Sequence, residues 1–249
     1  MIKSAEVFRP RPISNGMKAV ILAAGEGKRM QPLTFEVPKP LTRTRGKTLL
    51  EHTFDVLPQE ISEVVLVVGY LGQKIVDFCG DNFYGKKITY VWQDKKLGTG
   101  HALKLCEPHL RGTGKFLFMF SDDLFDKESI ADMITEDAAI HVAEHKEPWR
   151  FGVVSLNNDG SVHSIIEKPD TPSTNLVLTG VKVLSDKIFY YEPDLHPVSG
   201  EYYDVTMIQK MIQDGHTIVP VRARFWFPIA TPEDLKSAES YREGEKKSQ

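Results

Sequence analysis

A glycine-rich turn followed by cations is the first place in the sequence where residue types and spacing could do chemistry. The apolar stretch "VILAA" leads directly into "GEGKR" (25–29), and a second cationic segment, "PKP" (38–40), follows closely. A turn of this kind presents backbone N–H groups to an anion, and glycine lets the anion approach the backbone. The pattern indicates a phosphate site at the end of a strand.

Two common phosphate-binding fingerprints do not fit this turn. Met30 stands where the dinucleotide motif G-x-G-x-x-G needs its third glycine. The segment "RGKTLL" (45–50) ends like a P-loop, but Leu41 occupies the position of the first glycine and no strand precedes it. The turn is therefore predicted to bind phosphate in a different arrangement from both.

Acidic, basic and amide side chains follow other apolar runs. The run "KFLFMFSDD" (115–123) ends in two acids, and carboxylates combined with phosphate oxygens are the ligands that Mg²⁺ prefers. Gln93 ends another run, and its amide can donate and accept at a pyrimidine edge. Glu167 and Lys168 form an adjacent pair of opposite charge. Each could equally be a cap, a strand end or a surface ion pair, so the interpretation depends on their combination.

Composition narrows the class of protein. The chain has 249 residues with 31 Lys and Arg against 34 Asp and Glu, a net charge of -3, which argues against a protein that coats nucleic acid. No apolar run approaches the ~20 residues that a membrane span needs. The two cysteines, Cys79 and Cys106, lie in different expected elements. We therefore expect two reduced thiols, a cytoplasmic location, and neither nucleic acid nor membrane as a partner.

The elements that must position these residues alternate between strand and helix. Continuous apolar runs predict buried strands at 17–24, 63–69, 88–93 and 115–123, and helical spacing predicts helices at 48–57, 72–83, 100–110 and 127–136, with Thr99 as a cap of the third helix. This rhythm predicts an α/β fold with a doubly wound, mostly parallel sheet. Ligands are then expected at the carboxyl ends of the strands.

The texture of the sequence changes at about residue 138. Shorter strand-like segments follow at 138–145, 151–156, 162–168 and 178–184, and then an amphipathic helix at 202–215. We expect antiparallel additions to the same sheet, in one domain over 17–240. Residues 1–16 are predicted to be an arm or tail, and 241–249 a polar tail.

The segment "LAAGEGKRMQPLTFEVPKPL" (22–41) resembles the signature of the sugar-1-phosphate nucleotidyltransferases, also called nucleotide-sugar pyrophosphorylases. The resemblance continues in order through most of the chain, and it is nearest to the uridylyltransferase domain of N-acetylglucosamine-1-phosphate uridylyltransferases and to glucose-1-phosphate thymidylyltransferases. Its later segments are "QDKKLGTGHAL" (93–103), "FSDDL" (120–124), "FGVV" (151–154), "EKP" (167–169), "LTGVKV" (178–183) and "TPEDL" (231–235). It implies a Rossmann-like, glycosyltransferase-A-like fold, with a nucleotide part at about 17–137 and a sugar part at about 138–240.

The resemblance also implies a reaction and its residues. A sugar 1-phosphate oxygen would attack the α-phosphate of UTP or dTTP, with Mg²⁺ or Mn²⁺ as cofactor, and pyrophosphate would leave. The implied catalytic residues are Arg29, Lys39 and Asp122, with Asp122 also the metal ligand; the nucleotide-binding residues are Leu22, Ala23, Ala24, Gly25, Glu26, Gly27, Lys28, Gln93, Gly98 and Thr99; the sugar-phosphate-binding residues are Gly152, Glu167, Lys168 and Thr179. The partners would be a nucleoside triphosphate and a sugar 1-phosphate, bound by a monomer or small homo-oligomer.

The chain departs from the family pattern near its end. Many members carry an Asp that is a second metal ligand, or an Asn in the uridylyltransferases, where "WFPIAT" (226–231) places Pro228. Proline has no side-chain oxygen, so Asp122 would act with phosphate oxygens and water. Further acidic candidates for the metal are Asp123, Asp126 and Asp204. Leu178 stands where the N-acetylglucosamine enzymes place Asn, which weakens the case for an N-acetyl sugar.

Two other functions remain open at this point. Pro228 favours a catalytically impaired relative that binds a nucleotide or nucleotide-sugar as a regulatory subunit. Arg29, Lys39 and Asp122 oppose it, because a protein that only binds has less need of all three. A weaker alternative is a CTP-dependent cytidylyltransferase that acts on a phosphorylated alcohol.

Overall fold

A computed structural model describes residues 16–240 of the chain. The expected arm, apart from Gly16, and the expected tail at 241–249 lie outside these residues. Within them, no helix is long and apolar enough to cross a membrane.

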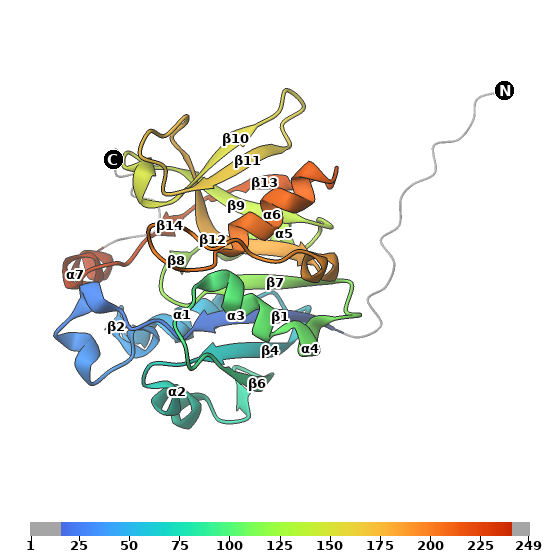
Figure 1. Cartoon of the computed structure of the whole chain (residues 1–249). Helices are drawn as coiled ribbons and strands as arrows, with labels where there is room; N and C mark the ends of the chain where they lie inside the picture. The colour runs from blue at the N-terminus through green and yellow to red at the C-terminus, as the bar shows by residue number, and fades with distance from the viewer. Residues whose placement is uncertain (1–15, 241–249) are drawn as a thin grey trace.

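Four parallel strands form the centre of the large sheet (Figure 1). They lie in the order β7-β1-β4-β6, and their bounds are β1 (Met17–Ala23), β4 (Ile61–Val68), β6 (Lys86–Trp92) and β7 (Lys115–Phe120). β1 from Ala19 onward and the second half of β4 are continuous apolar runs because both faces of the sheet are covered there. The predicted mixed α/β fold with a parallel centre is confirmed.

Antiparallel strands extend this sheet at both ends. β12 pairs with β7, β10 with β12, and β11 with β10, while β9 lies on β12 and β5 on β6. Their bounds are β5 (Asn82–Phe83), β9 (Ala139–Glu144), β10 (Gly152–Leu156), β11 (Val162–Glu167), β12 (Leu176–Ser185) and β13 (Val219–Arg222), the last parallel to β9. The second half of the chain therefore continues the sheet of the first half.

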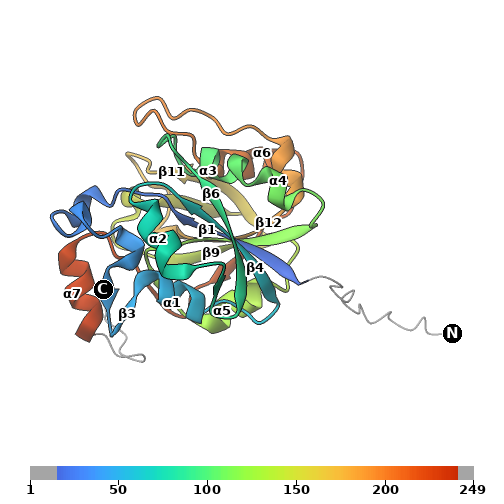
Figure 2. The ribbon, with the colours of Figure 1, turned by 90° about the horizontal axis from the view of Figure 1, so that it is seen from below.

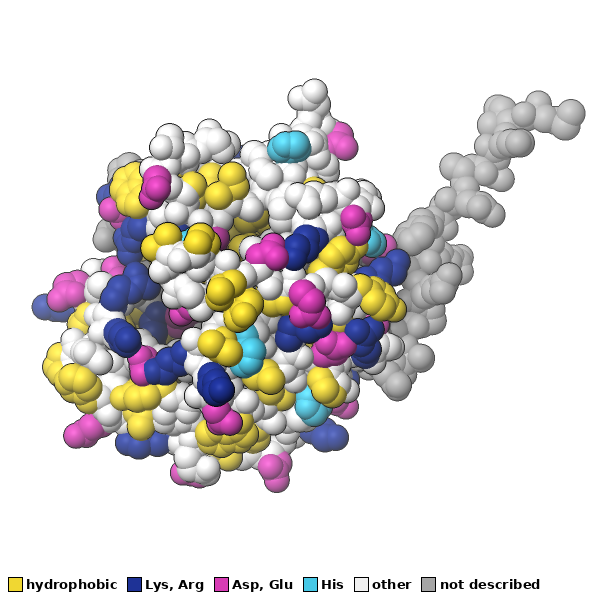
Figure 3. Space-filling model, in the orientation of Figure 1, with side chains coloured by type: hydrophobic (Ala, Val, Ile, Leu, Met, Phe, Trp, Pro, Cys, Tyr) yellow, Lys and Arg dark blue, Asp and Glu magenta, His cyan; other side chains and the backbone are white. Residues whose placement is uncertain are grey.

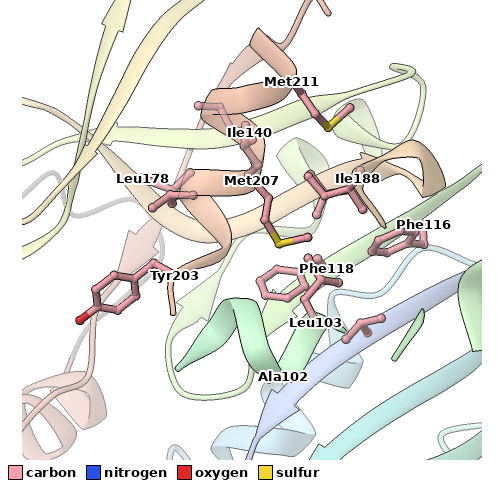
Figure 4. Packing of buried hydrophobic residues seen from close by; sticks show 14 of the residues in the cluster. Ala102, Leu103, Phe116, Phe118, Ile140, Leu178, Ile188, Tyr203, Met207 and Met211 are labelled. Carbon is pink, nitrogen blue, oxygen red and sulfur yellow. The ribbon is translucent and has the colours of Figure 1, made fainter. Parts of the chain in front are cut away.

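Helices cover the two faces of the sheet (Figure 2). One face carries α3 (Thr99–Leu105), α4 (Glu107–Leu110) and α6 (Asp204–Gln213), and the other carries α1 (Leu49–Asp55), α2 (Gly72–Cys79) and α5 (Lys127–Met133). On the first face, Leu103 of α3 and Met207 and Met211 of α6 pack against Phe116 and Phe118 of β7 (Figure 4). Alternate residues of each central strand point to opposite faces, so each strand contributes to both cores.

A smaller apolar cluster joins the two ends of the described chain. It contains Met30, Leu49, Leu124, Phe227, Ile229 and Ala238. The contributing elements are the 3-10 turn η1 (Lys28–Met30), the start of α1, β8 (Leu124–Phe125), β14 (Trp226–Phe227) with the residues after it, and α7 (Pro232–Ser240). Two further 3-10 turns, η2 (Leu33–Phe35) and η3 (Lys39–Leu41), and the hairpin of β2 (Arg43–Thr44) and β3 (Lys47–Thr48) lie between η1 and α1 in the sequence. This cluster fixes the turn after the glycine loop against the last segments.

Several predicted boundaries were wrong. The helix expected at 72–83 ends at Cys79, because Gly80 takes a φ of +60° and the chain then forms β5. The helix expected at 100–110 is divided into α3 and α4 at Cys106. Thr99 is the first helical residue, not the cap, and Gly98 holds the cap position with a φ of +93°. The strand expected at 115–123 ends at 120.

Candidate active site

Three adjoining pockets form one cleft at the carboxyl ends of β1 and β7, and Asp122 lines all three. Every catalytic, nucleotide-binding and sugar-phosphate-binding residue implied by the resemblance lines at least one of them. We name each after the group that the sequence predicts there: the phosphate pocket, around Gly25 and Arg29, the sugar pocket, around Glu167, and the base pocket, around Gln93, which has a volume of about 580 Å³. Figure 3 shows Lys and Arg side chains gathered around a hollow on this side of the molecule.

The glycine loop is tied to the second cationic segment. Gly27 has a φ of +62°, and a Cβ at this position would lie 3.0 Å from Lys39 Cβ and 3.1 Å from Thr34 Cγ2. The Thr34 hydroxyl donates to the Gly27 carbonyl at 2.9 Å. Gly25, by contrast, has open space where a side chain would stand. Gly27 therefore permits the close packing of the loop, while Gly25 leaves room for a ligand.

Lys39 and Asp122 meet at the centre of the cleft. Lys39 comes from η3, and Asp122 follows β7. The Lys39 ammonium lies 2.7 Å from Asp122 Oδ2. Lys39 is 8% exposed, whereas the Asp122 side chain retains 35% of its exposure. The structure thus brings together two predicted catalytic residues that are far apart in the sequence, beside Arg29.

The second acid of the "SDD" segment has a structural role. Asp123 accepts hydrogen bonds from Trp226 Nε1 at 3.0 Å and from the Ile229 amide at 2.9 Å. Burial, reinforced by the neighbouring Asp122 charge, raises the pKa of Asp123 to about 7. These bonds hold the segment that contains Pro228 beside the sugar pocket, which both Pro228 and Asp122 line.

The other acidic candidates for the metal are engaged elsewhere. The Asp126 carboxylate caps α5 by accepting from the Ser129 amide, and it also accepts from the amides of Arg224 and Phe225. Asp204 is paired with Lys182. Among residues 16–240, no group of three or more His, Cys, Asp and Glu could hold a metal ion. Asp122 would suit Mg²⁺ as a single carboxylate ligand, with phosphate oxygens and water supplying the remaining ligands.

The base pocket contains an anchored amide. Gln93 is 9% exposed, and its Nε2 donates to the Gly98 carbonyl at 2.9 Å and lies 3.1 Å from His101 Nδ1. Burial, and then the Lys95 charge, lower the pKa of His101. The amide is therefore held in one orientation by the segment that the sequence predicts to recognise the base.

A cationic rim lies at the mouth of the base pocket. Glu26 pairs with Lys28 and with Lys96, and all three residues line this pocket. Both lysines therefore share one carboxylate, which a more highly charged anion could replace.

The sugar pocket is lined by two charged residues at the end of β11, Glu167 and Lys168. Lys168 has a φ of +43°, a left-handed conformation that is unusual for a residue with a side chain, and its ammonium lies 3.4 Å from Glu167 Oε1. The ammonium also lies 5.4 Å from the centre of the Tyr203 ring. Burial raises the pKa of Glu167. Gly152 leaves room for this carboxylate, because a Cβ there would lie 3.2 Å from Glu167 Oε2.

A buried chain of hydrogen bonds holds Thr179 of the sugar pocket. His141 of β9 lies 2.8 Å from the Thr179 hydroxyl through Nδ1 and 2.8 Å from the Ser129 hydroxyl through Nε2. Ser129 donates onward to Asp126. Burial lowers the pKa of His141 to about 4, so the ring is neutral. The Ser129 hydroxyl donates its only proton to Asp126, so it can only accept from His141. The imidazole proton therefore lies on Nε2, and Nδ1 accepts from the Thr179 hydroxyl.

Sequence reasoning missed several residues of the sugar pocket. Its lining also includes Arg150, Lys182, Glu201, Tyr203 and Trp226. Two of them had a signal in the sequence: Lys182 is the one charged residue of the apolar strand β12, and Trp226 begins the segment at 226–231. Arg150, Glu201 and Tyr203 lie outside the strands, in connecting segments whose course the local sequence does not define.

Comparisons with known proteins agree on one family. Residues 18–244 match the family model described as nucleotidyl transferase. The UTP–glucose-1-phosphate uridylyltransferase AglF of Haloferax volcanii is 36% identical over 234 residues, covering 90% of this chain and 95% of that protein. The bifunctional protein GlmU of Methanococcus maripaludis is 32% identical over 228 residues. The chain spans about half of this second relative, 54% of its length.

Solved structures show the same fold. A protein from Bacillus anthracis assigned as a glucose-1-phosphate thymidylyltransferase superposes with a TM-score of 0.78 at 25% identity, covering 90% of this chain and 94% of that one. A UDP-glucose pyrophosphorylase bound to UDP-glucose also gives a TM-score of 0.78, at 19% identity, with 90% and 97% covered.

Proposed function

Because this chain belongs to the nucleotidyl transferase family, we propose that it transfers a nucleotidyl group from UTP or dTTP to a sugar 1-phosphate and releases pyrophosphate. The observation that carries the proposal is the Lys39–Asp122 pair, at 2.7 Å: Asp122 lines all three pockets, and Lys39 lines the phosphate and sugar pockets. A reaction between two phosphate groups requires a cation at the point where the two substrates meet.

The reaction needs positioning and charge stabilisation. An oxygen of the sugar phosphate bonds to the α-phosphorus, and the bond from that phosphorus to the oxygen of the leaving pyrophosphate breaks. In this proposal Lys39 stabilises the charge on the α-phosphate, and Arg29, with its fork of donors, holds the leaving group. The amides around Gly25 bind the triphosphate. Bound Mg²⁺ at Asp122 would supply additional positive charge to the phosphate oxygens.

Two pockets define the substrates. Gln93 and the Gly98 backbone would read the edge of a pyrimidine, with uracil and thymine as the expected bases. In the sugar pocket Lys168 would neutralise the sugar phosphate and Glu167 would accept from sugar hydroxyls. Leu178 lines this pocket with an apolar side chain, which supports a hexose 1-phosphate without an N-acetyl group.

Pyrophosphate release from a matrix of substrates tests the proposal. Four nucleoside triphosphates are combined with glucose 1-phosphate, galactose 1-phosphate, N-acetylglucosamine 1-phosphate and phosphocholine, with Mg²⁺ present. Turnover is expected with UTP or dTTP and a hexose 1-phosphate. Turnover only with CTP and phosphocholine would reject the sugar nucleotidyltransferase and support the cytidylyltransferase.

A catalytically impaired, regulatory relative is the second candidate function. The observation that favours it is Pro228, which lines the sugar pocket without offering a metal ligand. Nucleotide or nucleotide-sugar binding measured by calorimetry, with no turnover in any substrate pair, would establish this alternative.

A further inference from the structure

A buried ion pair lies beneath the sugar pocket. Lys182 of β12 has no exposed side-chain surface, and its ammonium lies 2.8 Å from Asp204 Oδ2 at the start of α6. The ammonium also stands over two rings, 4.7 Å from the centre of Phe118 and 5.0 Å from that of Phe120. Removing such charges from water is costly, and a well-packed apolar pair of similar size often gives equal or greater stability. Stability alone is therefore a weak explanation for this pair.

The second oxygen of Asp204 points to the nucleotide side of the cleft. The Thr99 hydroxyl donates to Asp204 Oδ1 at 2.5 Å, and the Asp204 amide donates back to the Thr99 hydroxyl at 3.3 Å. Thr99 is the first residue of α3, and it lines both the base pocket and the sugar pocket. Asp204 thus joins β12, which carries sugar-pocket residues, to the helix that begins at the base pocket.

Backbone contacts around this bond leave little freedom. The Gly100 amide donates to the Tyr202 carbonyl at 2.8 Å, and the Tyr202 amide donates to the Leu97 carbonyl at 2.7 Å. Gly98 has no space for a side chain, because a Cβ would lie 2.4 Å from the Tyr202 carbonyl oxygen. The segment before α6 and the loop before α3 therefore pack as one unit. The Asp204 carboxylate supplies the side-chain hydrogen bond that joins the two segments.

We propose that Asp204 is a positioning residue for the nucleotide: held by Lys182, it fixes Thr99 and hence the loop of Gly98 and Gln93 at the base pocket. This inference rests on the proposed function. Lys182 and Asp204 would act on the same cleft indirectly, through Thr99. Lys182 sets the position of Asp204, and Asp204 sets the start of α3. Nucleotide affinity is the property that this arrangement controls.

Substitutions at both ends of the Thr99–Asp204 bond test the inference. Thr99→Val keeps the ion pair and removes the donated hydrogen bond, while Asp204→Asn removes the charge. Each is expected to raise KM for the preferred triphosphate about ten-fold with kcat little changed, since a hydrogen bond to a charged group contributes roughly one such factor. Thr99→Ser is expected to restore KM, because serine keeps the hydroxyl.

A double-variant cycle separates this role from direct contact between Thr99 and the nucleotide. If Thr99 acts through Asp204, the double variant has nearly the same KM as either single variant. Lys104→Met is the matched control: Lys104 lies on the same helix in ion pairs with Glu107 and Glu192 and lines none of the three pockets, so its loss should leave KM unchanged. Asp204→Asn leaves the Lys182 charge without a carboxylate, and if that variant does not fold, Asp204→Glu, which keeps the charge but displaces the carboxylate relative to Thr99, takes its place in the cycle.

The outcomes distinguish this inference from the proposed function. If the wild-type protein shows no turnover with any triphosphate, the proposed function is wrong and the inference falls with it. If the wild type turns over while Thr99→Val keeps its KM, or if the two changes are simply additive, the inference alone is overturned. A lower melting temperature with unchanged KM would assign the pair a structural role only.

Discussion

At the residue scale, the chemistry of the cleft depends on a lysine that is almost fully buried. Lys39 is 8% exposed, and a buried ammonium requires a partner of opposite charge. Asp122 is that partner at 2.7 Å, and its own partial exposure leaves oxygen available to a ligand. Phosphate oxygens entering the cleft can share Lys39 with Asp122, so the pair holds each side chain in place before substrate binds.

The first prediction concerns Asp122. Asp122→Ala is expected to lower kcat by at least about 100-fold, the effect of losing a main stabiliser of developing charge, while nucleotide binding is only weakened. Pyrophosphate release and calorimetric titration with UTP or dTTP measure the two properties. Asp55→Ala is a control, because Asp55 pairs with Lys47 on the surface. Unchanged turnover in Asp122→Ala would remove this carboxylate from the reaction.

The second prediction concerns Pro228. This residue lines the pocket that Asp122 lines, so Pro228→Asp places a second carboxylate on the same pocket. The apparent affinity for Mg²⁺, read from the metal dependence of nucleotide binding, is expected to rise. Pro228→Asn is the neutral control. An affinity that does not change would show that position 228 is too far from Asp122 to share an ion.

At the element scale, buried carboxylates hold neighbouring segments together near the cleft. Asp126 caps α5 and also holds the backbone before β14, while Asp123 holds the backbone after it. Through Ser129 and His141 the same capping residue reaches Thr179 of β12. Asp126 at the start of α5 therefore helps to fix both β12 and β14, which border the cleft.

The third prediction is the pH dependence of this connection. His141 binds a proton near pH 6.5 when unfolded but only near 4 when folded, so the unfolded chain gains the proton first as pH falls. This single group then lowers the free energy of unfolding by up to about 3 kcal/mol between pH 6.5 and 4, and contributes no pH dependence above that window. Denaturant titrations at pH 7, 5.5 and 4.5 measure it.

Two variants control this measurement. His141→Asn lacks the titrating ring and should show a weaker loss of stability over the same range, although it starts from a lower value. His163→Asn is the matched control, because His163 is exposed, and it should keep the wild-type slope. Equal slopes in all three proteins would show that His141 does not carry the acid sensitivity.

At the scale of the whole molecule, one continuous sheet spans both halves of the sequence. β12 inserts antiparallel beside β7, with Val181–Ser185 paired to Lys115–Met119, so a strand from residue 180 onward completes the core of the first half. The buried cluster of Phe116, Phe118, Met207 and Met211 crosses the same boundary (Figure 4). We propose that 17–240 folds as a single domain, with nucleotide and sugar parts that share this core.

The fourth prediction tests that single domain. A fragment of residues 17–137 lacks β12 and α6, which leaves β7 as an unpaired edge and uncovers its aromatic face. The fragment is expected to show no cooperative thermal transition, while residues 17–240 unfold in one transition by both circular dichroism and tryptophan fluorescence. Cooperative unfolding of the fragment, or two separate transitions in the longer protein, would contradict the shared core.

The sequence predicts those parts of the fold and site that depend on neighbouring residues. β1, the start of α5 and the glycine turn were placed within a few residues, because apolar runs, an Asp before a helix and paired glycines act locally. The ends of α2 and β7 were misplaced, since their limits depend on Gly80 and on the turn that carries the two acids. The catalytic, nucleotide and sugar roles remain predictions until they are measured.

The sequence by itself determined that the chain has an α/β sheet, a phosphate-type loop and the motifs of one enzyme family. The tertiary structure decided which charges meet. It paired Lys39 with Asp122 across 83 positions and Thr99 with Asp204 across 105, and it turned Asp123 from a candidate ligand into the anchor of the Pro228 segment. The physical reason is that periodicity and turn chemistry act between neighbours, whereas burial and ion pairing depend on segments that meet only in the folded chain.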